Sequence, residues 1–424
     1  MSKQSYKTAH DLLQFKGIAL LLLTLLCLTL STGAQDIWLP LHGPLLATSS
    51  VSQDSIMLYD VGADQYRELR LGQGAHTVWD FSPDGCRILY TLSDGVWPAR
   101  LYSARLDGSD QTPLVQFDEL PAAQWSIDAP DWSSTGQIAF VLVRTDAEGK
   151  RIQHHIAVIE GTGGTPQMMS ITGDEYSPFW SPDGTRLAYL AYEKRAAGAD
   201  VFSTAVPTVA PPPGEKPPPA TLISEADLWI INADGSEKYN ATQFMVGNVG
   251  KPRWSPAGDL LAFEYASSGN NDTVWMIGSQ RGAFATQLSS QSTVIMDMTW
   301  LTDGTGILGA ISFFRDEPQN RLWQIPLVGQ AEVGAVRYLD ALPLTYADYP
   351  RFSPDGHWLA MRSEYRLVLV DVAAQTMSGL DERMSGNTPA VWSPTAFTGE
   401  KNCNPTLALP NSVGLYITHK SERG

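Results

Sequence analysis

The chain has 424 residues, of which 43% are hydrophobic and 10% aromatic, and this apolar content excludes a largely disordered protein. Its formal net charge of −16 argues against nucleic-acid binding, because phosphate recognition depends on Lys and Arg. Thirty-six glycines and 28 prolines indicate many turns rather than long helices.

The N-terminus is typical of a secretory signal. Three lysines precede the apolar run GIALLLLTLLCLTL (17–30), and small residues follow it. We expect residues 1–34 to be a signal peptide cleaved after Ala34, or an uncleaved signal-anchor in which residues 12–30 hold the chain to a membrane. The apolar run has 14 residues, fewer than the about 18 that a spanning helix needs. Either form predicts an exported protein, periplasmic or extracellular.

One phrase recurs along the rest of the chain: an aromatic residue, a four-residue turn and an alternating apolar run. SPFWSPDGTRLAYLAY (177–192) is a clear copy. The aromatic residues of the seven copies are Phe81, Trp132, Trp180, Trp254, Trp300, Phe352 and Trp392. Five of the six spacings between them fall between 40 and 52 residues, close to the length of a four-stranded propeller blade.

Each copy has the residues of a strand pair. Ser-Pro-Asp-Gly suits a type I turn between antiparallel strands. Proline two residues before the aromatic suits an edge strand, such as one beside a central channel. Two further strands complete each unit. The last copy lacks its following strands, whereas the strand-like residues 43–69 have no aromatic turn before them, so we expect the two ends to pair.

These observations predict an all-β fold: a seven-bladed β-propeller closed by N- and C-terminal strands, with six blades as the alternative. The propeller is expected to span residues 35–402, with a Pro-rich insertion over 193–227 in the third blade and a C-terminal tail over 403–424. The insertion suits a solvated spacer or a partner-binding arm.

The repeat resembles that of the TolB-like propellers, written W-S-P-D-G before an alternating strand. FSPDG (81–85), WSPDG (180–184) and FSPDG (352–356) match it closely, and the other copies depart at one or more turn positions. The resemblance implies a propeller and does not by itself imply a function. The repeat also resembles the propellers of prolyl-oligopeptidase-type peptidases, but the sequence has no G-x-S-x-G nucleophile motif.

We call the face with the aromatic turns the bottom of the propeller and the opposite face the top. Acidic residues stand where the innermost strands begin at the top, with one histidine nearby. The residues suggested for a binding site at the top mouth of the channel are His76, Asp128, Glu175, Asp297 and Asp348. Such a ring would suit a cation or a basic peptide, whereas loop residues in an acidic chain are often only solvated.

The sequence predicts no catalytic residue, metal site or cofactor. Cys86 and Cys403 fall at the bottom of adjoining blades, so in an exported chain they could form a disulfide that fastens the C-terminal tail. The adjacent His154 and His155 would point to opposite faces of a strand, which weakens a metal site there.

From the sequence we expect an exported, monomeric TolB-like propeller that serves as a non-catalytic binding or scaffold module. Its partner in the cell envelope would be a protein, a peptide or a glycan, and not a nucleic acid. It would contact a membrane only through its N-terminal segment, if that segment is retained. The alternative is a propeller enzyme of the polysaccharide-lyase or glycoside-hydrolase type with its site at the top channel mouth.

Overall fold

In the computed structural model the chain divides into two units, Met1–Pro40 and Leu41–Gly424. The structure describes residues 40–403 apart from 94, 96–98, 117–124, 147, 149, 170–173, 197–221, 245–246, 267–271, 290–292, 314–320, 328–335, 340–341, 343 and 345. The expected signal segment 1–34, residues 197–221 of the insertion and residues 404–424 of the tail lie outside the described residues. No helix within the described part of the chain is long and apolar enough to cross a membrane.

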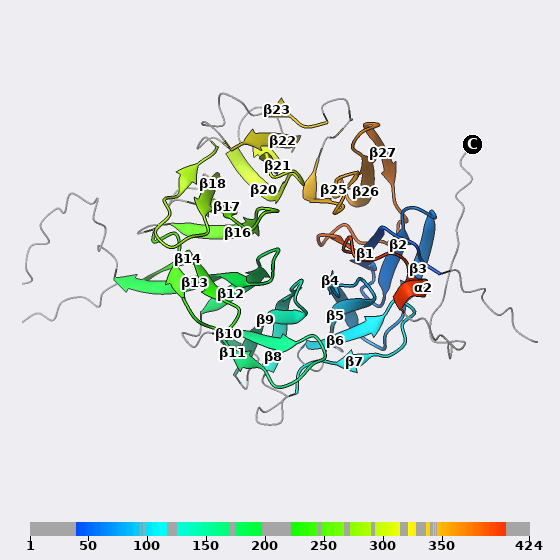
Figure 1. The fold of residues 1–424 in the computed structure, drawn as a ribbon, viewed down its shortest axis with the longest axis horizontal. Coiled ribbons are helices and arrows are strands. Elements are labelled where there is room, and N and C mark those ends of the chain that lie inside the picture. The colour runs from blue at the N-terminus through cyan, green and yellow to red at the C-terminus, as the bar shows by residue number, and fades with distance from the viewer. Residues whose placement is uncertain are drawn as a thin grey trace, which may run out of the picture. The chain divides into compact units, whose positions relative to one another are not determined.

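The described residues of the second unit form seven sheets of four antiparallel strands, arranged as propeller blades around a centre (Figure 1). We number the blades in the chain order of their aromatic turns. Blade 1 consists of β4 (Ala75–Phe81), β5 (Arg87–Ser93), β6 (Arg100–Arg105) and β7 (Thr112–Pro113). Blade 2 consists of β8 (Trp125–Trp132), β9 (Gln137–Thr145), β10 (Arg151–Glu160) and β11 (Gln167–Met168). Blade 3 consists of β12 (Glu175–Trp180), β13 (Arg186–Ala196), β14 (Leu222–Asn232) and β15 (Tyr239–Asn240).

The remaining blades follow the same order from the centre outwards. Blade 4 consists of β16 (Asn248–Trp254), β17 (Leu260–Ala266), β18 (Asp272–Gly278) and β19 (Thr286–Gln287). Blade 5 consists of β20 (Thr293–Trp300), β21 (Gly306–Phe313), β22 (Arg321–Pro326) and β23 (Val336–Arg337). Blade 6 consists of β24 (Asp348–Phe352), β25 (Trp358–Ser363), β26 (Arg366–Asp371) and β27 (Thr376–Gly379). Blade 7 consists of β28 (Val391–Trp392), β1 (Leu45–Ser49), β2 (Ile56–Asp60) and β3 (Gln65–Leu69). The prediction of an all-β, seven-bladed propeller is confirmed, and the six-bladed alternative is wrong.

Blade 7 closes the ring with strands from both ends of the propeller, as the repeat predicts. β28 supplies its innermost strand and pairs antiparallel with β1, so that Trp392 lies opposite Leu46 and Val391 lies opposite Ala47. Strands β2 and β3 complete the sheet. Because the two ends share one sheet, the backbone groups at the edge of β1 are paired rather than left open.

A second set of contacts fastens this closure. After β28 the chain reaches the short helix α2 (Glu400–Cys403). There Glu400 forms a buried ion pair with Arg67 of β3, with 2.7 Å between Oε1 and Nη1. Cys403 forms a disulfide with Cys86, which follows the turn of blade 1. The two cysteines singled out in the sequence are thus joined, and the link ties the end of blade 7 to blade 1.

The core lies between neighbouring blades, where the second strands are covered on both faces. Strand β9 shows this as an uninterrupted run of buried residues from 138 to 143. A fully buried aromatic side chain stands near the middle of the second strand in four consecutive blades: Tyr90, Phe140, Tyr189 and Phe263. Sheets that are covered on both faces have continuous apolar runs rather than strict alternation.

The aromatic turns are held by their own serine and aspartate. In blade 3, Ser181 Oγ donates to Asp183 Oδ1 (2.5 Å) and accepts from the N–H of Arg186 (3.0 Å). Asp183 Oδ1 also accepts from the N–H of Thr185 (3.1 Å), and the same contacts recur in blades 1 and 6. The hydrogen bond from Ser181 lowers the pKa of Asp183. These aspartates build the turns, in keeping with the turn chemistry of the sequence.

The glycine that ends the turn has a left-handed backbone, and in blade 1 it packs against the closing segment. Gly85 has a φ of 73°, and a Cβ at this position would lie 2.4 Å from Cβ of Phe397. Gly258 of blade 4 has nearly the same φ, 72°, but the nearest atom to its Cβ would be Pro182 Cδ at 3.4 Å. The two positions therefore share a backbone requirement and differ in packing.

We expect Gly85→Ala to lower the free energy of unfolding by about 2–4 kcal/mol, because a left-handed backbone costs about 1–2 kcal/mol and overpacking against Phe397 adds to it. Gly258→Ala is the matched control, and its free energy of unfolding should fall only by the cost of the left-handed backbone, about 1–2 kcal/mol. Urea unfolding followed by tryptophan fluorescence measures both variants. Equal losses would contradict the close packing of Phe397 on the first blade.

Candidate functional site

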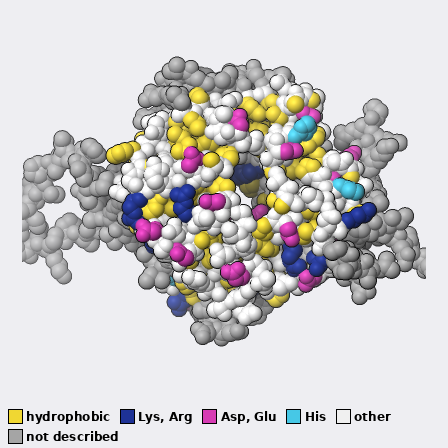
Figure 2. All heavy atoms as spheres, in the orientation of Figure 1, with side chains coloured by type: hydrophobic (Ala, Val, Ile, Leu, Met, Phe, Trp, Pro, Cys, Tyr) yellow, Lys and Arg dark blue, Asp and Glu magenta, His cyan; other side chains and the backbone are white. Residues whose placement is uncertain are grey.

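A cavity of about 780 Å³ occupies the central channel. The innermost strands of all seven blades contribute to its wall, and its rim at the bottom face includes the turn prolines Pro182, Pro256 and Pro354. Figure 2 shows a hollow at the centre of the face in view, with Lys or Arg side chains deep inside it. The volume falls within the range of about 300–1,000 Å³ that is usual for small-molecule sites. The cavity is therefore the candidate site.

A bulge shared by the innermost strands of blades 2, 3, 4 and 6 shapes the wall. In each strand a residue with a left-handed φ precedes a proline: Ala129 (45°), Ser177 (49°), Lys251 (48°) and Tyr349 (52°). The pairing with the second strand shifts register at this point. A bulge re-aims neighbouring side chains, and the residue after each of these prolines lines the cavity. The recurrent proline thus marks a bulge beside the channel.

The residue directly before each repeated aromatic lines the cavity and determines its charge. In chain order these residues are Asp80, Asp131, Phe179, Arg253, Thr299, Arg351 and Val391. Four of the seven are charged, and they supply the charge of the cavity wall in the described part of the chain. The two acids come from the adjoining blades 1 and 2, whereas the two arginines come from blades 4 and 6. The cavity therefore has an acidic side and a basic side.

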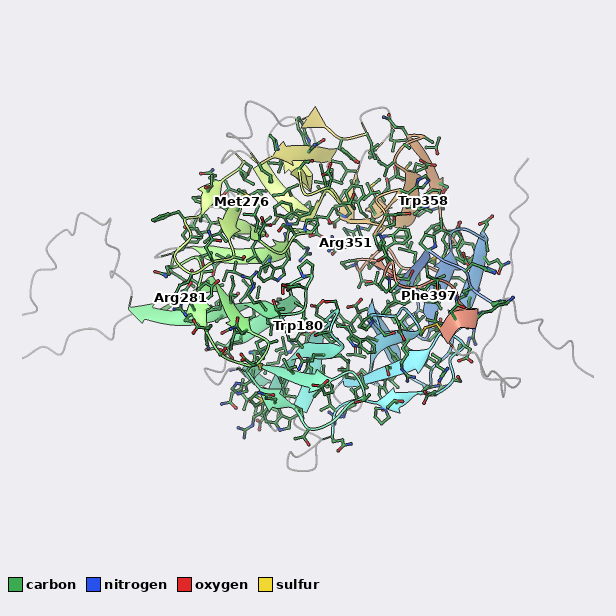
Figure 3. All side chains as sticks on the ribbon, viewed as in Figure 1. Trp180, Met276, Arg281, Arg351, Trp358 and Phe397 are labelled. Carbon is green, nitrogen blue, oxygen red and sulfur yellow. A yellow bond between two sulfur atoms is a disulfide. The ribbon has the colours of Figure 1, made fainter. Side chains whose placement is uncertain are left out.

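One buried carboxylate holds both arginines of the basic side. Arg253 Nη2 lies 3.2 Å from Asp297 Oδ1, and Arg351 Nη2 lies 2.9 Å from Asp297 Oδ2. Figure 3 shows Arg351 beside the central opening. Burial acts to raise the pKa of Asp297, but the charges of Arg351 and Arg253 hold it below its usual value. Burial and the charge of Arg351 lower the pKa of Arg253 to about 10, so it stays protonated at neutral pH.

On the acidic side, Asp80 and Asp131 accept hydrogen bonds from the backbone of the next blade. Asp80 Oδ2 accepts from the N–H of Trp132 (3.0 Å), and Asp131 Oδ2 accepts from the N–H of Trp180 (2.6 Å). Burial raises the pKa of both carboxyl groups, and the charge of Asp131 raises the pKa of Asp80 further, against the effect of the backbone N–H groups. The carboxyl groups of Asp80 and Asp131 therefore take up a proton at a higher pH than that of an ordinary aspartate.

Indole N–H groups make the equivalent links between other blades. Each indole donates to the carbonyl of the residue before the aromatic of the preceding blade: Trp254 Nε1 to Phe179 O (3.1 Å), Trp300 Nε1 to Arg253 O (2.9 Å) and Trp392 Nε1 to Arg351 O (3.0 Å). The position before the aromatic thus joins neighbouring blades and lines the cavity at the same time.

The five residues suggested from the sequence lie in different surroundings, and two of them are fully buried. His76 is 0% exposed and stacks on Tyr90, with 5.9 Å between the ring centroids. Glu175 is also 0% exposed, and its Oε2 lies 3.8 Å from His155 Nδ1. Both side chains therefore face the packed interior of their blades in this structure.

The other three have charged partners of their own. Asp128 is half-exposed and lies 3.3 Å from Arg151. Asp348 is buried and lies 2.6 Å from Arg362 Nη2. Asp297 is joined to the two arginines of the cavity wall. Each of the five suggested residues thus contacts a different partner. Among the described residues, no group of three or more His, Cys, Asp and Glu is placed to hold a metal ion.

The charged residues of the cavity wall were not predicted from the sequence, although a signal for them exists. The position directly before the repeated aromatic holds Asp in the first two copies and Arg in the fourth and sixth. Charged residues at one position of an otherwise apolar repeat indicate a shared surface rather than a core. Of the acids suggested from the sequence, Glu175 and Asp348 begin their innermost strands, at the other end from the aromatic. Asp128 and Asp297 lie within β8 and β20, and Asp297 is the one that contacts the charged residues of the cavity wall.

No model of a known protein family matches the chain. The uncharacterized peptidase YuxL of Bacillus subtilis (strain 168) is 24% identical over 249 residues, which are 58% of this chain and 30% of that protein. The chain thus matches less than a third of the length of this relative.

Solved structures share the propeller. An oligogalacturonate lyase in complex with manganese has a TM-score of 0.51 at 16% identity, over 77% of this chain and 83% of that chain. A prolyl endopeptidase has a TM-score of 0.54 at 12% identity, over 83% of this chain and 50% of that chain. TolB from Acinetobacter baumannii is also among the neighbours, with a TM-score of 0.46 at 17% identity, over 80% of this chain and 79% of that chain. At these identities the likeness shows the fold alone.

The raised pKa of Asp80 predicts a stability difference that depends on pH. A carboxyl group whose pKa is higher in the folded state stabilises the fold at low pH, and this contribution is lost as the pH rises through the raised pKa. Asp80→Asn cannot ionise. We therefore expect its free energy of unfolding, relative to the wild type, to increase between about pH 5 and about pH 8.

Asp183→Asn is the control, because the pKa of Asp183 is lowered and its titration falls below this window. Its difference from the wild type should stay constant over the same range. Urea unfolding at both pH values measures the two differences. A constant difference for Asp80→Asn would contradict the account of the acidic side.

Proposed function

We propose that this chain is an exported propeller that binds, without catalysis, a protein, peptide or glycan partner of the cell envelope, and that the partner enters the channel cavity. The observation that carries this proposal is the cavity wall. Four charged side chains from blades 1, 2, 4 and 6 line a space of small-molecule size that reaches the bottom face. A channel filled only for stability would be expected to bury apolar residues at these positions, since removing charged groups from water is costly even when they are paired.

The fixed positions of the two arginines support a binding role. Asp297 holds one side of each guanidinium, and the carbonyl of the preceding proline holds another: Arg253 Nη1 donates to Pro252 O (3.0 Å), and Arg351 Nη1 donates to Pro350 O (2.7 Å). A ligand that meets side chains already fixed in place loses less conformational entropy on binding. The wall is therefore organised before any partner arrives.

Export is supported by two features of the chain. The N-terminal segment 1–34 has the composition of a secretory signal, and the Cys86–Cys403 disulfide requires an oxidising compartment to persist. We place the protein in the periplasm or outside the cell, as a monomer, and anchored only if the signal segment is retained.

The second candidate function is catalysis on a polysaccharide, as a lyase or glycoside hydrolase. It is favoured by Asp80 and Asp131, because a carboxyl group with a raised pKa that lines a cavity can serve as a general acid. This candidate would place the reaction inside the channel cavity rather than at the top mouth.

Filling the cavity should abolish partner capture if the partner enters it. We expect Thr299→Trp to reduce capture of envelope components by the full chain at least about tenfold, which corresponds to about 1.4 kcal/mol of lost binding free energy. Thr376→Trp on the exposed outermost strand β27 is the matched control and should capture as the wild type does. Quantitative mass spectrometry of the retained components measures this. Unchanged capture by Thr299→Trp, with normal folding, would contradict entry into the channel.

The enzyme candidate has a separate test. Incubation of the wild-type chain with oligogalacturonate and with envelope polysaccharides should give no change in chain length by chromatography if the protein only binds. Turnover by the wild type that is lost in Asp80→Asn would overturn the non-catalytic proposal and assign the acidic side a chemical role.

A further inference from the structure

The basic side of the cavity has unused hydrogen-bonding capacity. A guanidinium carries five N–H donors in a fixed fork. In each of Arg253 and Arg351, Nη1 donates to a proline carbonyl and Nη2 pairs with Asp297. Both arginines line the cavity with side chains about one-fifth exposed, 23% and 20%. Donors not taken by these contacts are therefore available on two guanidinium groups that share a single carboxylate.

The local charge favours a monoanion. Two guanidinium charges are offset by one carboxylate, so the group formed by Arg253, Arg351 and Asp297 has a net charge of +1. Asp131 also interacts electrostatically with Arg253, but burial raises the pKa of Asp131 and so favours its neutral form. Asp297 is not itself part of the cavity wall, and its side chain is only 4% exposed. An anion in the cavity therefore meets the two arginines first and the carboxylate of Asp297 only behind them.

The acids on the opposite side are already engaged by the protein. Asp80 accepts from the N–H groups of Phe81 and Trp132, and Asp131 accepts from the N–H of Trp180. These contacts turn carboxylate oxygens towards the backbone of the blades. The arginines are therefore the groups best placed to recognise a charged ligand.

Apolar side chains make up much of the wall between the charged groups. They include Trp79, Pro130, Pro178, Phe179 and Val391. The indole nitrogen of Trp79 already donates to Thr91 Oγ1 (2.9 Å), and the guanidinium of Arg253 lies over the Phe179 ring, 5.5 Å from its centroid. Such a wall suits the side chains and backbone of a peptide better than the hydroxyl groups of a glycan, which need many polar partners.

We propose that the cavity binds the free C-terminal carboxylate of a peptide chain, held between Arg253 and Arg351. The proposal rests on the binding function proposed above and specifies its ligand. Guanidinium and carboxylate groups pair in a planar, bidentate geometry, so two converging arginines select a carboxylate over a neutral group. Seven blades enclose the cavity on all sides, so a ligand enters along the channel axis, and a chain end fits this path better than a doubled-back internal loop.

The test uses the full chain in mild detergent and four fluorescent probes. These are a pool of random pentapeptides with free C-termini, the same pool as C-terminal amides, an amidated pool enriched in internal Asp and Glu, and oligogalacturonate. Fluorescence anisotropy measures binding. We expect the free-acid pool to bind at least about tenfold more tightly than the other three, since a hydrogen bond to a charged group is stronger than one to a neutral group.

Variants separate recognition from folding. Arg351→Gln should weaken binding of the free-acid pool about tenfold or more. Arg362→Gln is the matched control, because Arg362 forms a comparable buried ion pair with Asp348 away from the cavity wall, and it should bind as the wild type does. In Arg351→Gln the carboxylate of Asp297 keeps its ion pair with Arg253 but loses the one with Arg351. The double variant Arg351→Gln with Asp297→Asn removes this half-compensated carboxylate and should regain stability without regaining binding.

Each outcome has a distinct meaning. Equal binding of the free-acid and amide pools would overturn the carboxylate proposal while leaving a peptide-binding propeller in place. Preference for the internal Asp and Glu pool would assign the arginines to an acidic side chain and overturn the chain-end proposal. Preference for oligogalacturonate would replace the peptide by an acidic glycan. Binding of no probe, together with unchanged capture by Thr299→Trp, would remove the proposed function as well.

Discussion

The structure depends on one position of the repeat, the residue directly before the aromatic of each turn. Its side chain or its carbonyl accepts a hydrogen bond from the aromatic residue of the next blade at five junctions. Two junctions lead to a phenylalanine, which has no indole N–H, and the residue of the preceding blade there, Thr299 or Val391, has no carboxylate to accept a backbone N–H. Other contacts are present at these two junctions. The ion pair between Asp297 and Arg351 joins blades 5 and 6, and the Cys86–Cys403 disulfide joins the end of blade 7 to blade 1. The ring is thus closed by specific polar or covalent links as well as by apolar packing.

The same position gives the channel its chemical character. Because these residues lie at the inner end of every blade, their side chains converge on one cavity whatever their type. The side chains of Asp80 and Asp131 accept hydrogen bonds from the backbone of the next blade. At Arg253 and Arg351 the backbone carbonyl accepts the hydrogen bond from the next blade, and the side chain lines the cavity. A repeat that is structural in most copies therefore carries the residues of the proposed binding site in a few of them.

The fold could be predicted from the sequence because its determinants are local. The Ser-Pro-Asp-Gly turn, the aromatic before it and their spacing specify a blade, and the unmatched strands at the two ends imply how the ring closes. The site could not be predicted in the same way. Which side chains reach the channel depends on the bulge at positions such as Ala129 and Tyr349, where the register shifts, and on ion pairs between different blades. Acids such as Glu175 looked equally suitable in the sequence but are buried beside a histidine.

The most direct test of the account is photocrosslinking in intact cells. A diazirine analogue of leucine at Val391 lies in the cavity wall with little change in size, and the same analogue at the exposed Tyr365 samples a surface outside that wall. The account predicts a crosslinked partner from position 391, and a loss of that product when Arg351 is replaced by Gln. A partner crosslinked from position 365 and not from 391 would contradict it, because binding would then occur outside the channel.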